Sequence, residues 1–292
     1  MNASRRSIPT LLRNRADRRS LLFVALFHAL VAVQLATGVR WWLVLAAGGL
    51  SFIACIVNHN QQHCATFRSA RLNRWFGVVL SFAIGQPASA IIPMHNRNHH
   101  VHNNQSEDLS RAANLRFRWS LANLLLYPFV TAARCAAAKE QHFREWREAE
   151  PELYRQLVLE RWILYPSLAV ALFFAPVPVL LALGVPYLIG QWGILAINFV
   201  QHDGCDPDSE YNHSRNFTGR WLNWWVLNNG FHTAHHRCPG LHWSRLPALH
   251  QHLAPHIDSR LEHPSITRTV VSHYLWPARR PAWKEEAWKE TA

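Results

Sequence analysis

The sequence lacks paired cysteines. Its five cysteines include no CxxC motif and their number is odd. This pattern argues against a disulfide framework and against a cysteine-based zinc or iron–sulfur site, so reduced thiols are expected. No nucleic-acid-binding motif is found either, and the formal net charge of +12 needs another explanation than DNA or RNA binding. The cysteines are Cys55, Cys64, Cys135, Cys205 and Cys238.

Charged residues are absent from long stretches. Residues 162–200 contain no Asp, Glu, Lys or Arg, residues 21–39 are apolar apart from His28 and Gln34, and residues 41–57 are again apolar. A transmembrane helix needs about 20 mostly apolar residues. The stretch 162–200 is too long for one span and carries Pro176 and Pro178 near its middle, so it is interpreted as two spans joined by a turn.

The sequence therefore predicts an all-α, multi-pass membrane protein with four transmembrane helices in two hairpins. The predicted spans are residues 21–39, 41–57, 162–175 and 179–200 of a membrane domain over 21–275, flanked by a basic, poorly ordered arm (1–20) and a polar tail (276–292). Between the hairpins we expect an interfacial helix over 121–138 and a charged surface helix over 139–160. A soluble all-α protein is the alternative, which uncharged runs of this length disfavour.

The distribution of Arg and Lys predicts the orientation. Six arginines lie in the first twenty residues, whereas the loop between the first two spans holds only Arg40 and the turn around Pro176 holds none. Positive residues favour the cytoplasmic side, so both termini and both large polar segments are expected there. No signal peptide is predicted, because no small-residue cleavage site follows the first apolar stretch.

Histidines are grouped in three motifs, HNQQH at 59–63, HNRNHH at 95–100 and HTAHH at 232–236. Residues three or four apart share one face of a helix, so each motif can direct two or three imidazoles to one point. His202 follows the last predicted span, one turn after Asn198, and all these residues fall on the predicted cytoplasmic side. The candidate metal-site residues are His59, His63, His95, His99, His100, Asn198, His202, His232, His235 and His236.

Nine histidines are more than one metal ion can use. Neutral imidazole suits zinc, copper or iron, but zinc normally takes four ligands in one closed site. Two ions of higher coordination, with iron as the best fit, are therefore predicted. His102, His213 and His242 are candidates to orient ligands, and His28 is expected to pack or hydrogen-bond inside the membrane. The histidines expected at the surface are His142, His250, His252, His256, His263 and His273.

In these residues the chain resembles the membrane fatty acid desaturase superfamily. The three motifs match its histidine boxes in order, NFVQH with Asn198 and His202 resembles its additional asparagine and histidine, and the two-hairpin layout matches over about residues 20–255. The middle box has three residues between its first two histidines, where many members have two.

The resemblance implies a non-haem di-iron centre under a cytoplasmic cap, with the nine histidines as iron ligands and Asn198 holding an iron-bound water or ligating weakly. The centre would activate O2 and remove hydrogen from a lipid or acyl-thioester substrate. The sequence shows no flavin, haem or rubredoxin-like motif. A separate electron donor, namely ferredoxin, rubredoxin or cytochrome b5, is therefore expected.

Three alternatives stay open at this stage. A hydroxylase or an oxidative decarboxylase would use the same site, since NFVQHDG also resembles the alkane hydroxylase branch. A histidine-rich metal transporter or sensor is a different class, which would place polar residues along an ion path through the spans. The predicted spans hold few polar residues beyond His28, Gln34, Gln191 and Asn198.

Four aromatic residues near the histidine motifs are candidates to line a tunnel for the lipid substrate: Trp221, Trp224, Trp225 and Phe231.

Overall fold

The computed structural model describes residues 11–275, and this part of the chain is almost entirely helical. The predicted polar tail at 276–292 lies outside the described residues, as do residues 1–10. The long helices are α1 (Arg18–Thr37), α2 (Trp41–His63), α3 (Ala70–Ile84), α5 (Ser120–Ala149), α6 (Pro151–Phe174) and α8 (Val185–His202). The short helices are α4 (His100–His102), α7 (Pro176–Val179), α9 (Arg220–Trp225), α10 (His232–Arg237), α11 (Leu246–Leu253) and α12 (Ile266–Val270). Two short strands, β1 (Asn216–Phe217) and β2 (Glu262–His263), pair in parallel.

Five described helices are long and apolar enough to cross a membrane. Four of them correspond to the predicted spans, with α7 continuing through a π-helical turn at Leu180–Gly184 into α8. The fifth is α5, which was expected to be interfacial. The chain is therefore a multi-pass membrane protein by helix length and composition, with five candidate spans where four were predicted.

The predicted boundary between an apolar helix and a charged helix near residue 139 is wrong. The helix α5 continues unbroken to Ala149, and α6 begins at Pro151, eleven residues before the predicted span. A change from apolar to charged side chains does not interrupt backbone hydrogen bonding. The break falls at Glu150 because the residue before a proline is sterically disfavoured in the α conformation and proline is well suited to the first helical turn.

The segment after α3 turns sharply. Gly85 caps α3 with a left-handed backbone (φ 74°), Pro87 follows, and the axis bends by 77° between Ala70–Ile84 and Ala88–His102. Glycine adopts this conformation without steric cost, and proline cannot continue the helix. Gly85 and Pro87 thus divide this apolar stretch into two helical parts with different directions.

The closest helix pair is α2 with α8. A Cβ atom built on Gly190 would lie 2.5 Å from Ser51 Oγ and 2.9 Å from the Ser51 carbonyl carbon, so the two backbones touch at this point. Gly48 of α2 receives the side chain of Ile189 in the same way, with 2.6 Å to its Cδ1. Small residues allow such close approach of helices inside membranes. The helices that end in His63 and His202 are therefore held in fixed register.

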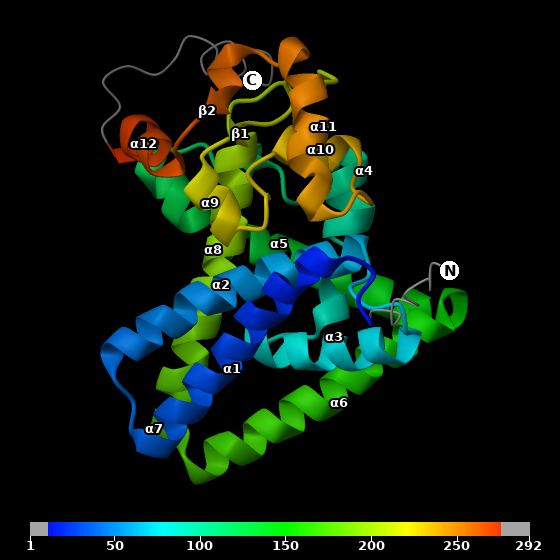
Figure 1. The fold of residues 1–292 in the computed structure, drawn as a ribbon, viewed down its shortest axis with the longest axis vertical. Coiled ribbons are helices and arrows are strands. Elements are labelled where there is room, and N and C mark those ends of the chain that lie inside the picture. The colour runs from blue at the N-terminus through cyan, green and yellow to red at the C-terminus, as the bar shows by residue number, and fades with distance from the viewer. Residues whose placement is uncertain (1–10, 276–292) are drawn as a thin grey trace, which may run out of the picture.

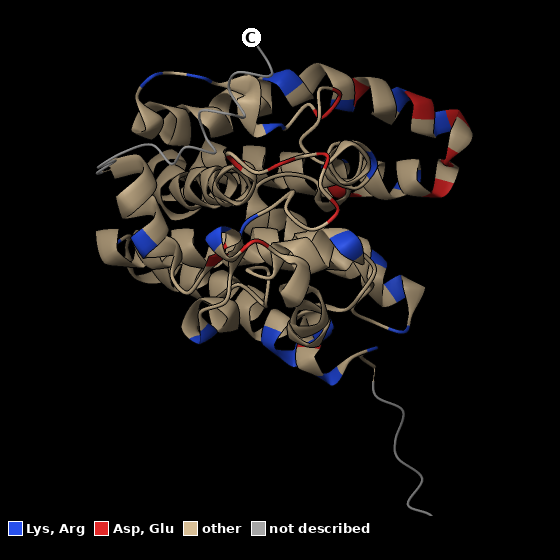
Figure 2. Ribbon diagram, turned by 90° about the horizontal axis from the view of Figure 1, so that it is seen from above, with Lys and Arg blue, Asp and Glu red and all other residues tan. Residues whose placement is uncertain are grey.

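The two hairpin turns and the short C-terminal helices lie at opposite ends of the molecule. In Figure 1 the α1–α2 connection and the α6–α7 connection lie together at the lower left, whereas α9 to α12 gather at the top. The C-terminal ends of α2 and α8 both lie away from the hairpin turns (Figure 1). Figure 2 shows Lys and Arg mostly around the outside, and many of the acidic positions where α5 meets α6.

Residues 11–20, expected as part of a poorly ordered arm, are ordered against the C-terminal part. Leu12 forms an isolated antiparallel bridge with Phe67, and the buried carboxylate of Asp17 accepts hydrogen bonds from Trp243 Nε1 (2.9 Å) and His242 Nε2 (3.1 Å). Buried carboxylates need such partners, because desolvation of a charge is costly. His242 is thus hydrogen-bonded to Asp17 and Ser244, and none of its hydrogen bonds orients a histidine of the three motifs.

Candidate metal centre

The nine predicted histidines come together in two adjacent groups. The first, the five-histidine group, contains His59, His63, His95, His100 and His235; the second, the four-histidine group, contains His99, His202, His232 and His236. Within each group, one potential ligand atom per residue lies within 4.8 Å of all the others. The groups adjoin, since the ring centroids of His100 and His236 are 4.5 Å apart. Each group could hold a metal ion.

The middle motif divides between the groups in a way that helical spacing did not predict. His95 and His99 were expected on one face, but His95–His99 forms a π-helical turn with backbone bonds of the i→i+5 type, such as His99 N–H to Met94 O at 2.9 Å. The wider turn aligns His95 with His100 (Nε2 to Nε2, 3.0 Å) and directs His99 to the other group. Single π-helical turns are frequent at functional sites.

The third motif also serves both groups. His232 and His236 lie one α-helical turn apart on α10 and belong to the four-histidine group, with 3.2 Å between their Nε2 atoms. His235 belongs to the five-histidine group, 3.0 Å from His59 Nε2. Burial, reinforced by the neighbouring histidines, lowers the pKa of His232, His235 and His236 well below the ordinary value. These rings therefore stay neutral near pH 7 and can offer lone pairs.

Three of the histidines form hydrogen bonds through Nδ1, on the side of the ring away from the other histidines, and these bonds direct Nε2 toward the centre of each group. Asp108 accepts from His99 Nδ1 at 2.6 Å, the carbonyl of His213 accepts from His202 Nδ1 at 3.1 Å, and Asn60 Oδ1 accepts from His59 Nδ1 at 3.1 Å. An oxygen partner requires the hydrogen on Nδ1, so Nε2 carries the lone pair in His99 and His202, whereas His59 Nδ1 also lies 3.4 Å from the amide donor Asn229 Nδ2. Such partners fix the tautomer and orientation of metal-binding histidines.

Asp108 was not predicted from the sequence. Its side chain is 1% exposed and also accepts hydrogen bonds from the backbone of Asn104 and from Ser110, both 2.8 Å. Burial by itself raises the pKa of this carboxyl, but His99 and the hydrogen bonds outweigh it, and the pKa is lowered. The loop returns to His99 because Asn103 and Asn104 adopt positive φ, which asparagine tolerates better than most residues. Only the polar run after the middle motif hinted at it.

The end of α8 is fixed by a second unpredicted residue. Arg215 is fully buried, and its guanidinium donates to the carbonyl oxygens of Val200 and, at 3.2 Å, of Asp203. The last carbonyl groups of a helix have no intrahelical partner, and a cation there satisfies them. The same strand region holds α10, because Asn216 Oδ1 accepts from the Thr233 backbone at 3.0 Å. Arg215 and Asn216 thus position His202 and the third motif.

The other residues predicted near the metal site make contacts of their own. Asn198 donates from Nδ2 to the hydroxyl of Tyr127 at 3.3 Å. His102 belongs to neither group, and His213 contributes its carbonyl while its ring centroid is 5.3 Å from that of His236. His28, as expected, forms a hydrogen bond: its Nε2 on α1 lies 3.2 Å from the carbonyl oxygen of Val79 on α3.

One surface prediction fails among the remaining histidines. His250 is 6% exposed, and its Nε2 lies 3.1 Å from Glu262 Oε2. Glu262 in turn accepts from Asn216 at 2.9 Å, so this pair belongs to the interior of the C-terminal part. The residues next to His250 in the sequence did not predict its burial, because its contacts come from other segments: Phe231, with 4.8 Å between ring centroids, and Glu262 of β2.

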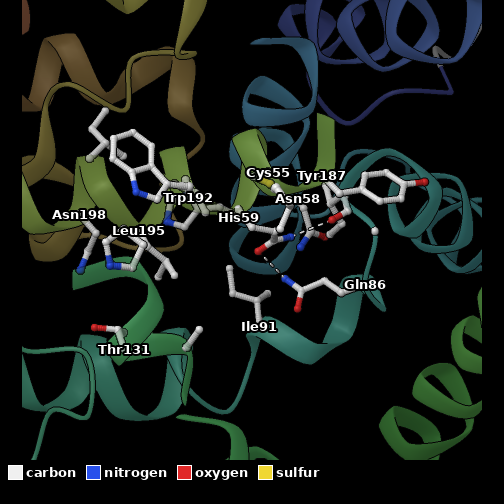
Figure 3. Close-up of a pocket in the computed structure, with 18 of the residues that line it drawn as sticks. Cys55, Asn58, His59, Gln86, Ile91, Thr131, Tyr187, Trp192, Leu195 and Asn198 are labelled. Carbon is white, nitrogen blue, oxygen red and sulfur yellow. Dashed lines mark hydrogen bonds between the residues drawn. The ribbon is translucent and has the colours of Figure 1, made fainter. Parts of the chain in front are cut away.

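A cavity of about 800 Å³ reaches both histidine groups. It includes His59 and His95 of the first group and His232 of the second, and it continues along α8 between mostly apolar walls. Figure 3 shows Trp192, Leu195 and Asn198 of α8 on one side, Gln86 on the other and Thr131 of α5 below. A long apolar molecule that enters this cavity would pass beside the histidines.

The prediction that aromatic residues near the third motif line the substrate cavity is wrong. Trp221, Trp224 and Trp225 are 73%, 42% and 48% exposed, and neither they nor Phe231 line the cavity. The short helix α9 lies at the surface and presents its tryptophans outward, as aromatic residues at a membrane interface do. The cavity is instead formed by α2, α5, α8 and the bent segment after α3.

The comparison with known families decides the identity. A family model described as fatty acid desaturase matches residues 36–265, which include all three histidine motifs and His202. The chain belongs to the fatty acid desaturase family. A search of curated proteins found no match. As a fatty acid desaturase family member, the chain is an oxidoreductase associated with membranes and lipid substrates, and its two histidine groups provide the sites that could bind metal.

Proposed function

We propose that the chain is an O2-dependent fatty acyl desaturase that uses two iron ions, one in each histidine group. The observation that carries the proposal is that histidines of both groups line one mostly apolar cavity. An alkyl C–H bond offers neither an acidic proton nor a polar group, so acid–base chemistry cannot break it and an oxidising metal must. When bound, the two ions would supply that oxidising power.

The spacing of the nitrogens fits metal ions. Metal–nitrogen bonds of about 2.1 Å at right angles place neighbouring nitrogens about 3 Å apart. The Nε2–Nε2 distances are 3.0 Å for His59–His235, 3.0 Å for His235–His100 and 2.9 Å for His202–His232. Each Nε2 carries one hydrogen or one lone pair, so His235 cannot hydrogen-bond fully to both neighbours. Lone pairs that converge on one point explain these contacts.

The donor set favours iron over zinc. Structural zinc sites take four ligands, usually including cysteine, whereas the larger group here has five imidazoles and no thiol. Imidazole also binds iron, and the redox activity that C–H oxidation requires is absent from zinc. We propose His59, His63, His95, His100 and His235 for one ion and His99, His202, His232 and His236 for the other. Asn198 lines the cavity together with His59 and His232, and it is proposed to hold a water at the centre or to ligate weakly.

The chain's own residues would orient the substrate and exclude water. The α8 side chains Leu195 and Leu188 and the bent-segment residue Ile91 line the cavity and would hold an extended acyl chain beside His59 and His232. Holding one carbon of a flexible chain in place supplies much of the rate gain in such reactions. Because a desaturase and a hydroxylase share this first hydrogen removal, the product distinguishes them.

Purified protein with reconstituted iron tests the proposal. We expect about two iron ions per chain and O2 consumption that depends on lipid and reductant. We also expect a product whose mass is about 2 Da lower than that of the substrate, as removal of two hydrogens requires. A gain of one oxygen atom would identify a hydroxylase instead. Metal binding without any lipid oxidation would contradict the enzyme and favour a transporter or sensor.

We further propose that the histidine groups and both termini face the cytoplasm, with α1, α2, α6 and α7–α8 as the four spans. The ends of α2 and α8 that carry His63 and His202 lie away from both hairpin turns, and those turns contain only Arg40 as a charged residue. This distribution agrees with the positive-inside rule. Cysteine labelling from outside intact cells should modify a cysteine introduced at Gly38 and leave one at Gly240 unmodified.

Electrons would come from a separate protein, for which ferredoxin, rubredoxin and cytochrome b5 are the candidates. The net charge of +12 favours an acidic donor. Attraction between exposed charges is screened over about 8 Å at physiological ionic strength and over shorter distances at higher salt. Reduction by an acidic donor is therefore expected to slow as salt is raised, measured by stopped-flow spectroscopy. A rate independent of salt would contradict electrostatic docking.

A further inference from the structure

The cavity has one charged side chain in its wall, and it is a lysine. Lys139 lines the same cavity as His59 and His232, and no arginine, aspartate or glutamate is among the described residues that line it. It is also the only lysine in residues 11–275, where arginine is otherwise the basic residue; the other two are Lys284 and Lys289. A lone cation facing an apolar cavity needs an explanation, because an unpaired charge next to apolar surroundings is costly.

The position of Lys139 follows from α5. Pro128, Thr131, Cys135 and Lys139 are spaced by three or four residues, and all four line the cavity, so they form one stripe on one face of the helix. The stripe begins next to Tyr127, whose hydroxyl accepts the hydrogen bond from Asn198. At 1.5 Å per residue, Lys139 lies on the order of 18 Å along the helix from Tyr127.

Lys139 has no direct hydrogen-bond or ion-pair partner among the described residues, although the nearby carboxylate of Glu140 favours its charge through space. The neighbouring carboxylate of Glu140 is 2.6 Å from Arg161 and thus forms an ion pair elsewhere, and within the described part of the chain no hydrogen bond or ion pair joins the Lys139 ammonium to another residue. The cavity wall also includes residues of α8 and of the π-helical turn before it, where Leu181 and Gly184 are apolar. The cavity thus combines a long apolar arm with one positive charge.

We propose that Lys139 binds the singly charged anionic head group of the substrate and thereby fixes the distance from that head group to the oxidised carbon. This inference rests on the proposed function and names its substrate class: an amphiphile whose head carries one negative charge, as a fatty acid carboxylate or a phosphodiester does. A single ammonium suits one unit of charge. A head group with several phosphates would need several cations, and the cavity lining offers only Lys139.

Ligand binding without turnover tests the proposal. The full chain in neutral detergent is titrated with radiolabelled hexadecanoate, and hexadecan-1-ol and phosphatidylglycerol serve as unlabelled competitors. Lys139→Met keeps the length of the side chain and removes the charge. We expect it to weaken hexadecanoate or phosphatidylglycerol binding by about tenfold, the scale of one charge-assisted hydrogen bond, while hexadecan-1-ol binding stays unchanged. Lys139→Arg should retain most of the affinity.

The matched control is Arg134→Met, which removes a positive charge from an exposed position of the same helix outside the cavity. It should bind all three probes as the wild type does. A charge-dependent effect on hexadecanoate alone identifies a free acid, and one on phosphatidylglycerol alone identifies a lipid head group. The proposal is overturned if both anions bind no better than hexadecan-1-ol, or if Lys139→Met leaves anion affinity unchanged.

A second measurement needs no substitution. Reductive methylation modifies lysine amines, and bound hexadecanoate or phosphatidylglycerol should protect Lys139, as peptide mass spectrometry would show. Equal modification of Lys139 with and without both probes would count against head-group binding. Because neither assay requires oxygen, reductant or turnover, an inactive protein would refute the proposed desaturase while leaving head-group binding testable, and the reverse also holds.

Discussion

Replacing His235 with alanine is expected to abolish lipid oxidation and to reduce the iron content from about two ions to one per chain. His235 Nε2 lies 3.0 Å from both His59 Nε2 and His100 Nε2, so the five-histidine group loses its central member. The four-histidine group keeps all its nitrogens. The rate should fall by about 10³-fold or more, the scale seen when a catalytic unit loses one member. Iron is measured by plasma mass spectrometry, and turnover by O2 consumption.

Two further variants make this result specific. His236→Ala should also leave one ion per chain, but that ion would reside in the five-histidine group, which Mössbauer spectroscopy can distinguish from the other. His252→Ala removes an exposed histidine outside both groups and should keep both ions and full activity. Unchanged iron content and turnover in His235→Ala, with the protein folded as judged by circular dichroism, would remove His235 from the ligand set.

Asp108→Asn is expected to lower turnover or iron affinity by about 10- to 100-fold, the usual cost of losing an outer partner of a metal-binding histidine. The carboxylate accepts from His99 Nδ1 at 2.6 Å and from the Asn104 backbone at 2.8 Å through the same oxygen. An amide has one oxygen and one NH2 group, so it cannot satisfy all the donors around it. His99 would lose the interaction that fixes its tautomer.

Iron titration followed by O2 consumption measures this effect, and the deficit should concern the four-histidine group that contains His99. Glu107→Gln is the matched control, because it removes the adjacent carboxylate, which is exposed and lies in the same loop. Its iron affinity and rate should equal those of the wild type. If Asp108→Asn bound both ions as tightly as Glu107→Gln and turned over equally fast, the proposed role of Asp108 would be wrong.

The sequence predicted the histidines of the site but not their division. Helical spacing alone placed His95 with His99, whereas the π-helical turn pairs His95 with His100. One extra residue in a turn changes which side chains align, and the energetic difference between α and π hydrogen bonding depends on the surrounding packing. The third motif divides for a different reason. Its helix, α10, lies between the two groups, and the hydrogen bond from the Thr233 backbone to Asn216, 17 residues earlier, holds it there.

Contacts between segments that are distant in the sequence could not be predicted from local sequence patterns. Asp108 meets His99 only because two asparagines turn the loop back, and His242 meets Asp17 across 225 residues. The cavity wall likewise combines residues from α2, α5 and α8, so the expected tunnel near Trp224 had no local basis. In contrast, the apolar helices were predictable, since a run without charge has few other stable environments. Their ends were less predictable where helices continued past the apolar stretch.

The backbone contact between α2 and α8 has a practical consequence for redesign. Ser51 and Gly190 meet eight residues before His59 and twelve before His202, so this joint sets how far apart the two ends stand. Any larger residue there would shift ligands of both groups at once. The α5 wall contributes no histidine to either group, so changes at Ala132 or Cys135 could retune which lipids are accepted while the metal-bearing scaffold keeps its shape.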